Sequence, residues 1–81
     1  MTYRIELAKP AQKFIQKQPR AQQERLLRAI AKLPTEGDIK PLTGRAGLYR
    51  LRIGDYRVIY TVDNDVLLVL IMNVGNRGDV Y

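Results

Sequence analysis

The fold is decided by one stretch of the chain, LYRLRIGDYRVIYTV at residues 48–62. Apolar and polar side chains alternate on both sides of Gly54-Asp55, which predicts two strands, 48–53 and 56–62, joined by a two-residue turn. Glycine in the first position of such a turn is typical of a type II′ hairpin, so the register can be predicted. The expected pairs across the ladder are Tyr49–Tyr60, Arg50–Ile59, Leu51–Val58, Arg52–Arg57 and Ile53–Tyr56.

The two faces of this hairpin differ in chemistry because side chains alternate along a strand. The apolar face carries Tyr49, Leu51, Ile53, Tyr56, Val58 and Tyr60, whereas the opposite face carries Arg50, Arg52 and Arg57. Like charges directly opposite destabilise a ladder, and Arg52 faces Arg57 here. A cluster that lowers stability indicates an anionic ligand. The alternative is an exposed sheet face whose long side chains cover Ile59.

The residues before the hairpin predict a strand and two helices. Residues 3–7 alternate like a strand, with Tyr3, Ile5 and Leu7 inward. Pro10 suits the first turn of a helix that runs to about Gln18, and Pro19 then opens a second helix. This second helix, about Arg20–Leu33, has an apolar stripe of Leu26, Leu27, Ile30 and Leu33. Residues 34–47 contain two Pro and three Gly and are expected to form a loop anchored by Ile39 and Leu42.

The residues after the hairpin predict one more strand. Asp63-Asn64-Asp65 is expected to turn, and Val66–Met72 is apolar on both faces, as in a strand covered on both sides. Gly75–Gly78 is expected to turn again, before a tail of residues 79–81. The sequence therefore predicts a single α+β domain over residues 1–81, with an N-terminal strand, a helical hairpin and a three-stranded antiparallel meander in one sheet.

The charge of the chain indicates an acidic partner. The net charge is +6 and the pI about 10.0, which favours a nucleic acid. Residues 1–44 carry nine basic and four acidic groups, and residues 45–81 carry five and four. The helical half therefore supplies the long-range positive field, while the sheet half holds the local arginine cluster.

The composition excludes several kinds of chemistry. The chain has no Cys, His or Ser, so disulfides, thiolate zinc sites, imidazole catalysis and serine nucleophiles are excluded. Gly44–Gly47 lacks the length and the lysine of a nucleotide-binding loop, and we expect neither a cofactor nor a metal. The first residues lack the apolar segment of a signal peptide, and the longest apolar run is too short to span a bilayer. We therefore expect a cytoplasmic protein without a membrane partner.

The hairpin, together with VGNRGDVY at residues 74–81, resembles the RelE family of bacterial and archaeal toxins. In that family a basic and aromatic hairpin precedes a terminal segment of glycine, arginine, valine and tyrosine. The resemblance extends over nearly the whole chain and implies a RelE-like fold, similar to that of microbial ribonucleases. It also implies the toxin of a type II toxin–antitoxin system, a ribosome-dependent endoribonuclease that cuts mRNA in the A site and is neutralised by a RelB-like antitoxin.

The resemblance also assigns residue roles. Its basic catalytic positions fall on Arg50, Arg52, Arg57 and Arg77, and its tail tyrosine on Tyr81. We expect Arg57, Arg77, Tyr81 and Arg52 to act in catalysis, and Arg50, Arg45, Lys40 and Asn76 to contact the RNA phosphates. Arg50 and Arg52 stand where well-studied members have lysines, and Asn76 where many have histidine. Because arginine, with a pKa above about 12, is a very poor proton acceptor, phosphate binding transfers to this chain while the general base stays open.

Two other functions remain open at this point. The neighbouring ParE branch shares the architecture and inhibits DNA gyrase without cutting RNA. The missing base also leaves room for a catalytically weak member that only binds its antitoxin.

Overall fold

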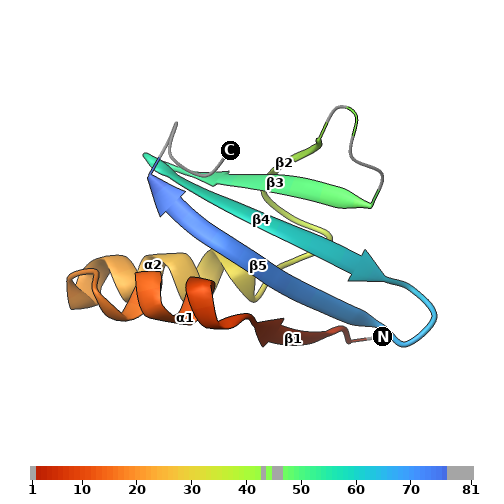
Figure 1. Ribbon diagram of the computed structural model, residues 1–81, viewed down its shortest axis with the longest axis horizontal. Coiled ribbons are helices and arrows are strands. Elements are labelled where there is room, and N and C mark those ends of the chain that lie inside the picture. The colour runs from red at the N-terminus through yellow and green to blue at the C-terminus, as the bar shows by residue number, and fades with distance from the viewer. Residues whose placement is uncertain (1, 43, 45–46, 77–81) are drawn as a thin grey trace.

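The computed structural model describes residues 2–42, 44 and 47–76 (Figure 1). Its elements, in chain order, are β1 (Arg4–Leu7), α1 (Lys9–Gln16), α2 (Arg20–Ile30), β2 (Asp38–Pro41), β3 (Leu48–Ile53), β4 (Tyr56–Asp63) and β5 (Leu68–Asn76). The strands form one sheet in the order β1-β5-β4-β3-β2, in which only β1 and β5 run parallel. Figure 1 shows both helices along one side of this sheet. The predicted α+β class is confirmed, with five strands in place of four.

The hairpin of β3 and β4 has the predicted register at every predicted pair, from Tyr49–Tyr60 to Ile53–Tyr56. Gly54 opens its turn with a φ of 57°, a backbone conformation that glycine adopts without the penalty of a Cβ atom. The alternation of the two strands therefore sends one set of side chains toward the helices and the other set to the helix-free face.

The core lies between the helices and the apolar face of the sheet. Its buried members are Ala11, Ile15, Leu26, Ile30, Leu33, Leu51, Ile53, Val58, Tyr60, Val69, Ile71 and Val74. Aromatic contacts extend it, since the rings of Tyr49 and Tyr60 stack at 5.6 Å and Phe14 meets Tyr56 edge-on at 6.0 Å. The Tyr56 hydroxyl donates to Oε1 of Gln18 at 3.0 Å, which ties the hairpin to the residues after α1.

The helices are shorter than predicted. α1 ends at Gln16, and α2 ends at Ile30, where a tighter bond from the Leu33 N–H to the Ile30 carbonyl at 3.0 Å replaces the helical pattern. Pro34 lacks an N–H and cannot continue the helix. The prediction that Leu27 is buried is wrong, because this side chain lies about 100° around the helix from Leu26 and is 43% exposed.

The fifth strand, β2, lies inside the segment that was predicted to be a loop. It pairs antiparallel with the edge of β3, so its backbone groups gain the partners that a loop would have to find in water. Ile39 packs against the core from the middle of β2, and Pro41 is tolerated because the strand is at the edge of the sheet. The loop prediction is therefore wrong for Asp38–Pro41.

The last strand differs most from its prediction. β5 begins at Leu68, after a turn that includes Val66, and continues through Gly75 and Asn76, which were predicted to turn. The helices cover one side of it only, so the prediction of a strand covered on both sides is wrong. The rest of the predicted turn and tail, residues 77–81, lies outside the described residues.

β5 also contains a β-bulge. Ile59 pairs with Asn73 and Tyr60 with Ile71, so Met72 is an extra residue on β5. The extra residue shifts the alternation of side chains by one position beyond it.

Among the described residues, no helix is long and apolar enough to cross a membrane.

Candidate nucleic-acid interface

Four cationic residues from three adjacent strands share the helix-free face. Arg52 pairs with Arg57 across β3 and β4, as predicted, and Lys40 of β2 pairs with Arg50. Paired residues point to the same face of a sheet, and their neighbours Leu51 and Val58 point into the core. We define the basic face as Asp38, Lys40, Arg50, Arg52 and Arg57.

Asp38 is the acidic member of the basic face, and sequence reasoning missed it. Its register partner is Arg52, but its carboxylate Oδ1 accepts from Nη2 of Arg50 at 3.3 Å. The alternation of Asp38, Ile39 and Lys40 was a strand signal in the sequence, but it was outweighed by the surrounding proline and glycine. The face thus carries four cations against one carboxylate, a formal charge of +3.

Arg50 is buried, although the sequence indicated an exposed face. It is 8% exposed because β2 flanks it on one side and β4 on the other. Ile59, directly opposite Arg50, is buried as well, as expected if the stems of these long side chains cover it.

Two guanidinium groups of the basic face have unused donors. Nε of Arg50 and Nε of Arg52 are buried and lack a hydrogen-bond partner among the described residues. Buried donors are normally satisfied, so these two point to a missing acceptor. A guanidinium group matches the oxygens of a phosphate with parallel donors, so the arrangement suits an RNA or DNA backbone.

The structure does not bring all the predicted site residues together. Asn76 pairs with Tyr56, whose ring packs on the helical side, so Asn76 belongs to the opposite face of the sheet from Arg57. Arg57 pairs instead with Gly75, which has no side chain to fill the space beside it. Arg45, Arg77 and Tyr81 lie outside the described residues.

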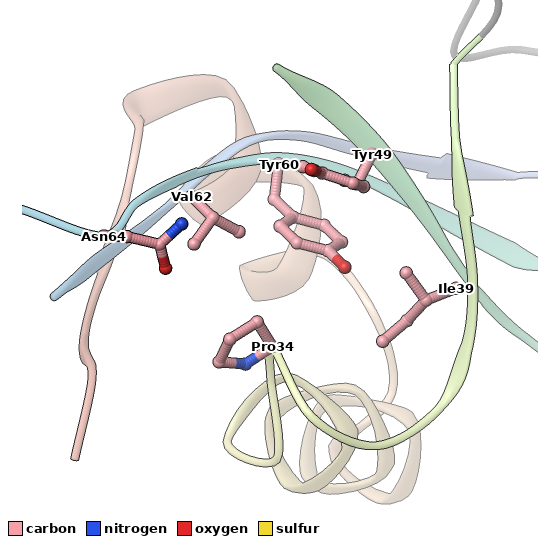
Figure 2. Close-up of a pocket in the computed structure, with 6 residues that line it drawn as sticks. All are labelled: Pro34, Ile39, Tyr49, Tyr60, Val62 and Asn64. Carbon is pink, nitrogen blue, oxygen red and sulfur yellow. The ribbon is translucent and has the colours of Figure 1, made fainter. Parts of the chain in front are cut away.

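A pocket of about 230 Å³ lies on the helical side of the sheet, away from the basic face (Figure 2). Its lining consists of Pro34, Ile39, Tyr49, Tyr60, Val62 and Asn64. Burial, together with the neighbouring Tyr49, raises the pKa of Tyr60 to about 12, so its hydroxyl stays protonated at neutral pH. The pocket therefore offers polar and apolar surface in similar proportion, and none of its lining side chains carries a positive charge for an anionic ligand.

No group of three or more metal-ligating side chains occurs in the part of the chain that the structure describes. The chemistry available on the basic face is anion binding by fixed positive charges.

This α+β arrangement, a five-stranded sheet with a helical hairpin on one side, matches solved structures of RelE toxins. The RelE chain of the RelE–RelB complex from Pyrococcus horikoshii superposes with a TM-score of 0.79 at 35% identity, covering 99% of this chain and 100% of that one. Isolated Escherichia coli RelE gives 0.78 at 21% identity, with 94% and 85% covered, which supports the fold alone.

The sequence comparisons identify the family. Toxin RelG of Mycobacterium tuberculosis is 30% identical over 90 residues, covering 100% of this chain and 98% of RelG. The family model for the ParE toxin of type II toxin–antitoxin systems matches residues 5–81. The chain belongs to this family and is a type II toxin of the RelE/ParE superfamily.

Proposed function

We propose that this toxin is an endoribonuclease that cleaves mRNA on the ribosome, acting in the cytoplasm as a single domain over residues 1–81. The observation that carries the proposal is the basic face, with four cations on three strands and unused donors on Arg50 and Arg52. The 35% identity to an archaeal RelE over almost the full length supports RelE-type activity.

In the proposed reaction the RNA supplies its own nucleophile. The 2′-hydroxyl attacks the adjacent phosphorus, the bond from phosphorus to the 5′-oxygen breaks, and the leaving oxygen gains a proton. The products are a 2′,3′-cyclic phosphate, or its opened form, and a 5′-hydroxyl. We assign Arg57 and Arg77 to the scissile phosphate, where fixed donors stabilise the extra negative charge of the transition state.

The remaining residues of the predicted site assist the reaction or orient the RNA. Arg52 donates to the transition state beside Arg57, whereas Arg50 and Lys40 bind flanking phosphates. Tyr81 stacks on a base or passes a proton. Since guanidinium groups do not accept protons, positioning and charge supply most of the rate. This explains a need for the ribosome, which would hold the mRNA in the reactive geometry.

The helices support binding to a large RNA surface. Lys9 and Arg20 are the first residues of α1 and α2, and neither helix has an acidic residue in its first turn. A cation at a helix N-terminus opposes the helix dipole, at a cost of about 0.3–1 kcal/mol each. Lys13 and Lys17 extend this exposed positive surface, and no acidic residue occurs between Lys9 and Gln23. We assign this surface to the RNA of the ribosome.

We further propose a RelB-like antitoxin as the partner that neutralises the toxin, because the archaeal RelE at 35% identity was crystallised with RelB. An acidic or amphipathic segment that covers the basic face would meet its charge. The rate of association should then fall as salt is raised. If the product of the adjacent gene neither binds the toxin nor restores growth, this partner is wrong.

Inhibition of DNA gyrase is the second candidate, favoured by the match to the ParE family model. The test is to induce the toxin in cells that carry one reporter transcript with an initiation codon and one without it, and to map 5′ ends. The proposal predicts new ends only in the translated transcript. Equal cutting of both contradicts the need for the ribosome, and intact RNA with an induced DNA-damage response favours gyrase.

A further inference from the structure

The two residues of the ion pair between Asp38 and Arg50 differ strongly in solvent exposure. The side chain of Arg50 is 10% exposed, whereas that of Asp38 is 56% exposed on the edge strand β2. The carboxylate can turn into water at little cost, but the guanidinium cannot leave its place between the strands. A charge that is held in this way needs an anionic partner in every state of the protein.

The contact between the two residues is also incomplete. A single pair of atoms joins them, Nη2 of Arg50 and Oδ1 of Asp38, at 3.3 Å. Hydrogen bonds between ionised groups are usually about 2.7–2.9 Å, and arginine often binds a carboxylate through two of them. The diagonal position explains the shortfall, because Asp38 is the register partner of Arg52 and reaches sideways to Arg50. Nε of each arginine stays without an acceptor among the described residues.

We infer that Asp38 is an exchangeable counter-ion of the basic face. In the free toxin its carboxylate occupies part of the position of an RNA phosphate, and the phosphate displaces it into solvent. The inference rests on the proposed function for the identity of the ligand. The inference adds to the proposed function a residue, Asp38, that lowers the affinity of the free toxin for RNA phosphates. Asp38 thereby limits binding to RNA away from the ribosome.

The variant that tests this is Asp38→Asn, which removes the charge but keeps an oxygen that can accept from Arg50. The matched control is Glu24→Gln, which changes the net charge equally on the exposed side of α2. The probe is a labelled five-nucleotide RNA with 2′-O-methyl groups throughout, which cannot be cleaved. Binding is measured from about 50 to 300 mM KCl, since phosphate contacts depend on salt.

We expect Asp38→Asn to bind the probe about tenfold more tightly than Glu24→Gln at the lowest salt, because a charge a few ångström from a phosphate is removed. The difference should shrink as salt rises. In an Arg50→Gln background the gain should disappear, since the two residues act on one site. The melting temperature of free Asp38→Asn should fall, because Arg50 loses its charged partner.

Three results would overturn the inference. Equal affinities of Asp38→Asn and Glu24→Gln for the probe would mean that Asp38 acts only through the net charge of the protein. Weaker binding by Asp38→Asn would make Asp38 a residue that holds Arg50 in place for binding. A gain that persists in the Arg50→Gln background would place its effect elsewhere.

Inorganic phosphate separates this inference from the proposed function. If phosphate raises the melting temperature of Asp38→Asn more than that of Glu24→Gln while no RNA is bound or cleaved, the exchange stands and the nuclease proposal fails. If mRNA is cleaved and the two variants respond equally to phosphate and to the probe, the nuclease proposal stands and the exchange fails.

Discussion

Replacing Arg52 by methionine should make the toxin more stable and less active at the same time. Arg52 faces Arg57 directly across β3 and β4, and no ion pair joins Arg52 to another described residue. Its buried Nε lacks an acceptor among those residues. Methionine is shorter than arginine but keeps an unbranched apolar stem, and it removes both the like charge and the unused donor.

The expected gain in stability follows from the repulsion between Arg52 and Arg57 that the substitution removes. Like charges directly opposite in a ladder destabilise it by about 0.2–1 kcal/mol, which is a rise in melting temperature of roughly 1–8 °C for a domain of this size. Loss of one donor to the transition state should lower cleavage about 10²–10³-fold. Lys32→Met is the matched control, because it removes one charge from an exposed residue after α2 and should change neither quantity much.

The assay combines thermal unfolding with cleavage of ribosome-bound mRNA by each purified variant. A melting temperature that falls in parallel with activity would make Arg52 a structural residue. A rise in melting temperature with wild-type cleavage would remove Arg52 from the site and refute its assigned role.

Three further predictions test the scaffold and the site. Because the pKa of Tyr60 is raised from 10.0 to about 12, its contribution to stability, at most about 3 kcal/mol, is complete below pH 10 and lost by about pH 12. Tyr60→Phe should therefore lose less unfolding free energy than the wild type between pH 10 and pH 12, as measured by urea titrations at each pH. The same pH dependence in both proteins would contradict the raised pKa of Tyr60. Gly54→Ala should lower stability by about 1–2 kcal/mol in the same titrations, because φ is 57° and the new Cβ would lie 2.7 Å from Nη2 of Arg25. Tyr81→Phe should lose as much cleavage as Tyr81→Ala if the hydroxyl passes a proton, or stay near wild type if the ring stacks, and wild-type cleavage by Tyr81→Ala would exclude both roles.

The hairpin could be predicted from the sequence because its determinants are local. Alternation of polar and apolar residues, interrupted at Ile59, and a glycine at the turn define both strands and their register within residues 48–62. The strand β2 could not be recognised in the same way, since four residues that include a proline have little strand preference of their own and depend on the edge of β3. Missing β2 meant missing the burial of Arg50 and its contact with Asp38.

The bulge in β5 explains the position of Asn76. Unbroken alternation from the buried Ile71 would put Asn76 on the basic face with Arg57. The extra residue Met72 shifts the alternation by one, so that Val74 is buried and Asn76 pairs with Tyr56 on the helical side. A bulge arises from pairing between strands that are distant in sequence, and nothing in the local pattern of residues 66–76 announces it.

The most direct test of the proposed chemistry uses mRNA bound to ribosomes with a single 2′-deoxy nucleotide on the 5′ side of the mapped cleavage position. The account predicts that the unmodified mRNA yields a 2′,3′-cyclic phosphate, or its opened form, and a 5′-hydroxyl, and that the deoxy nucleotide abolishes the cut at that position alone. Continued cutting at the deoxy position, or products with a 5′-phosphate, would contradict attack by the 2′-hydroxyl.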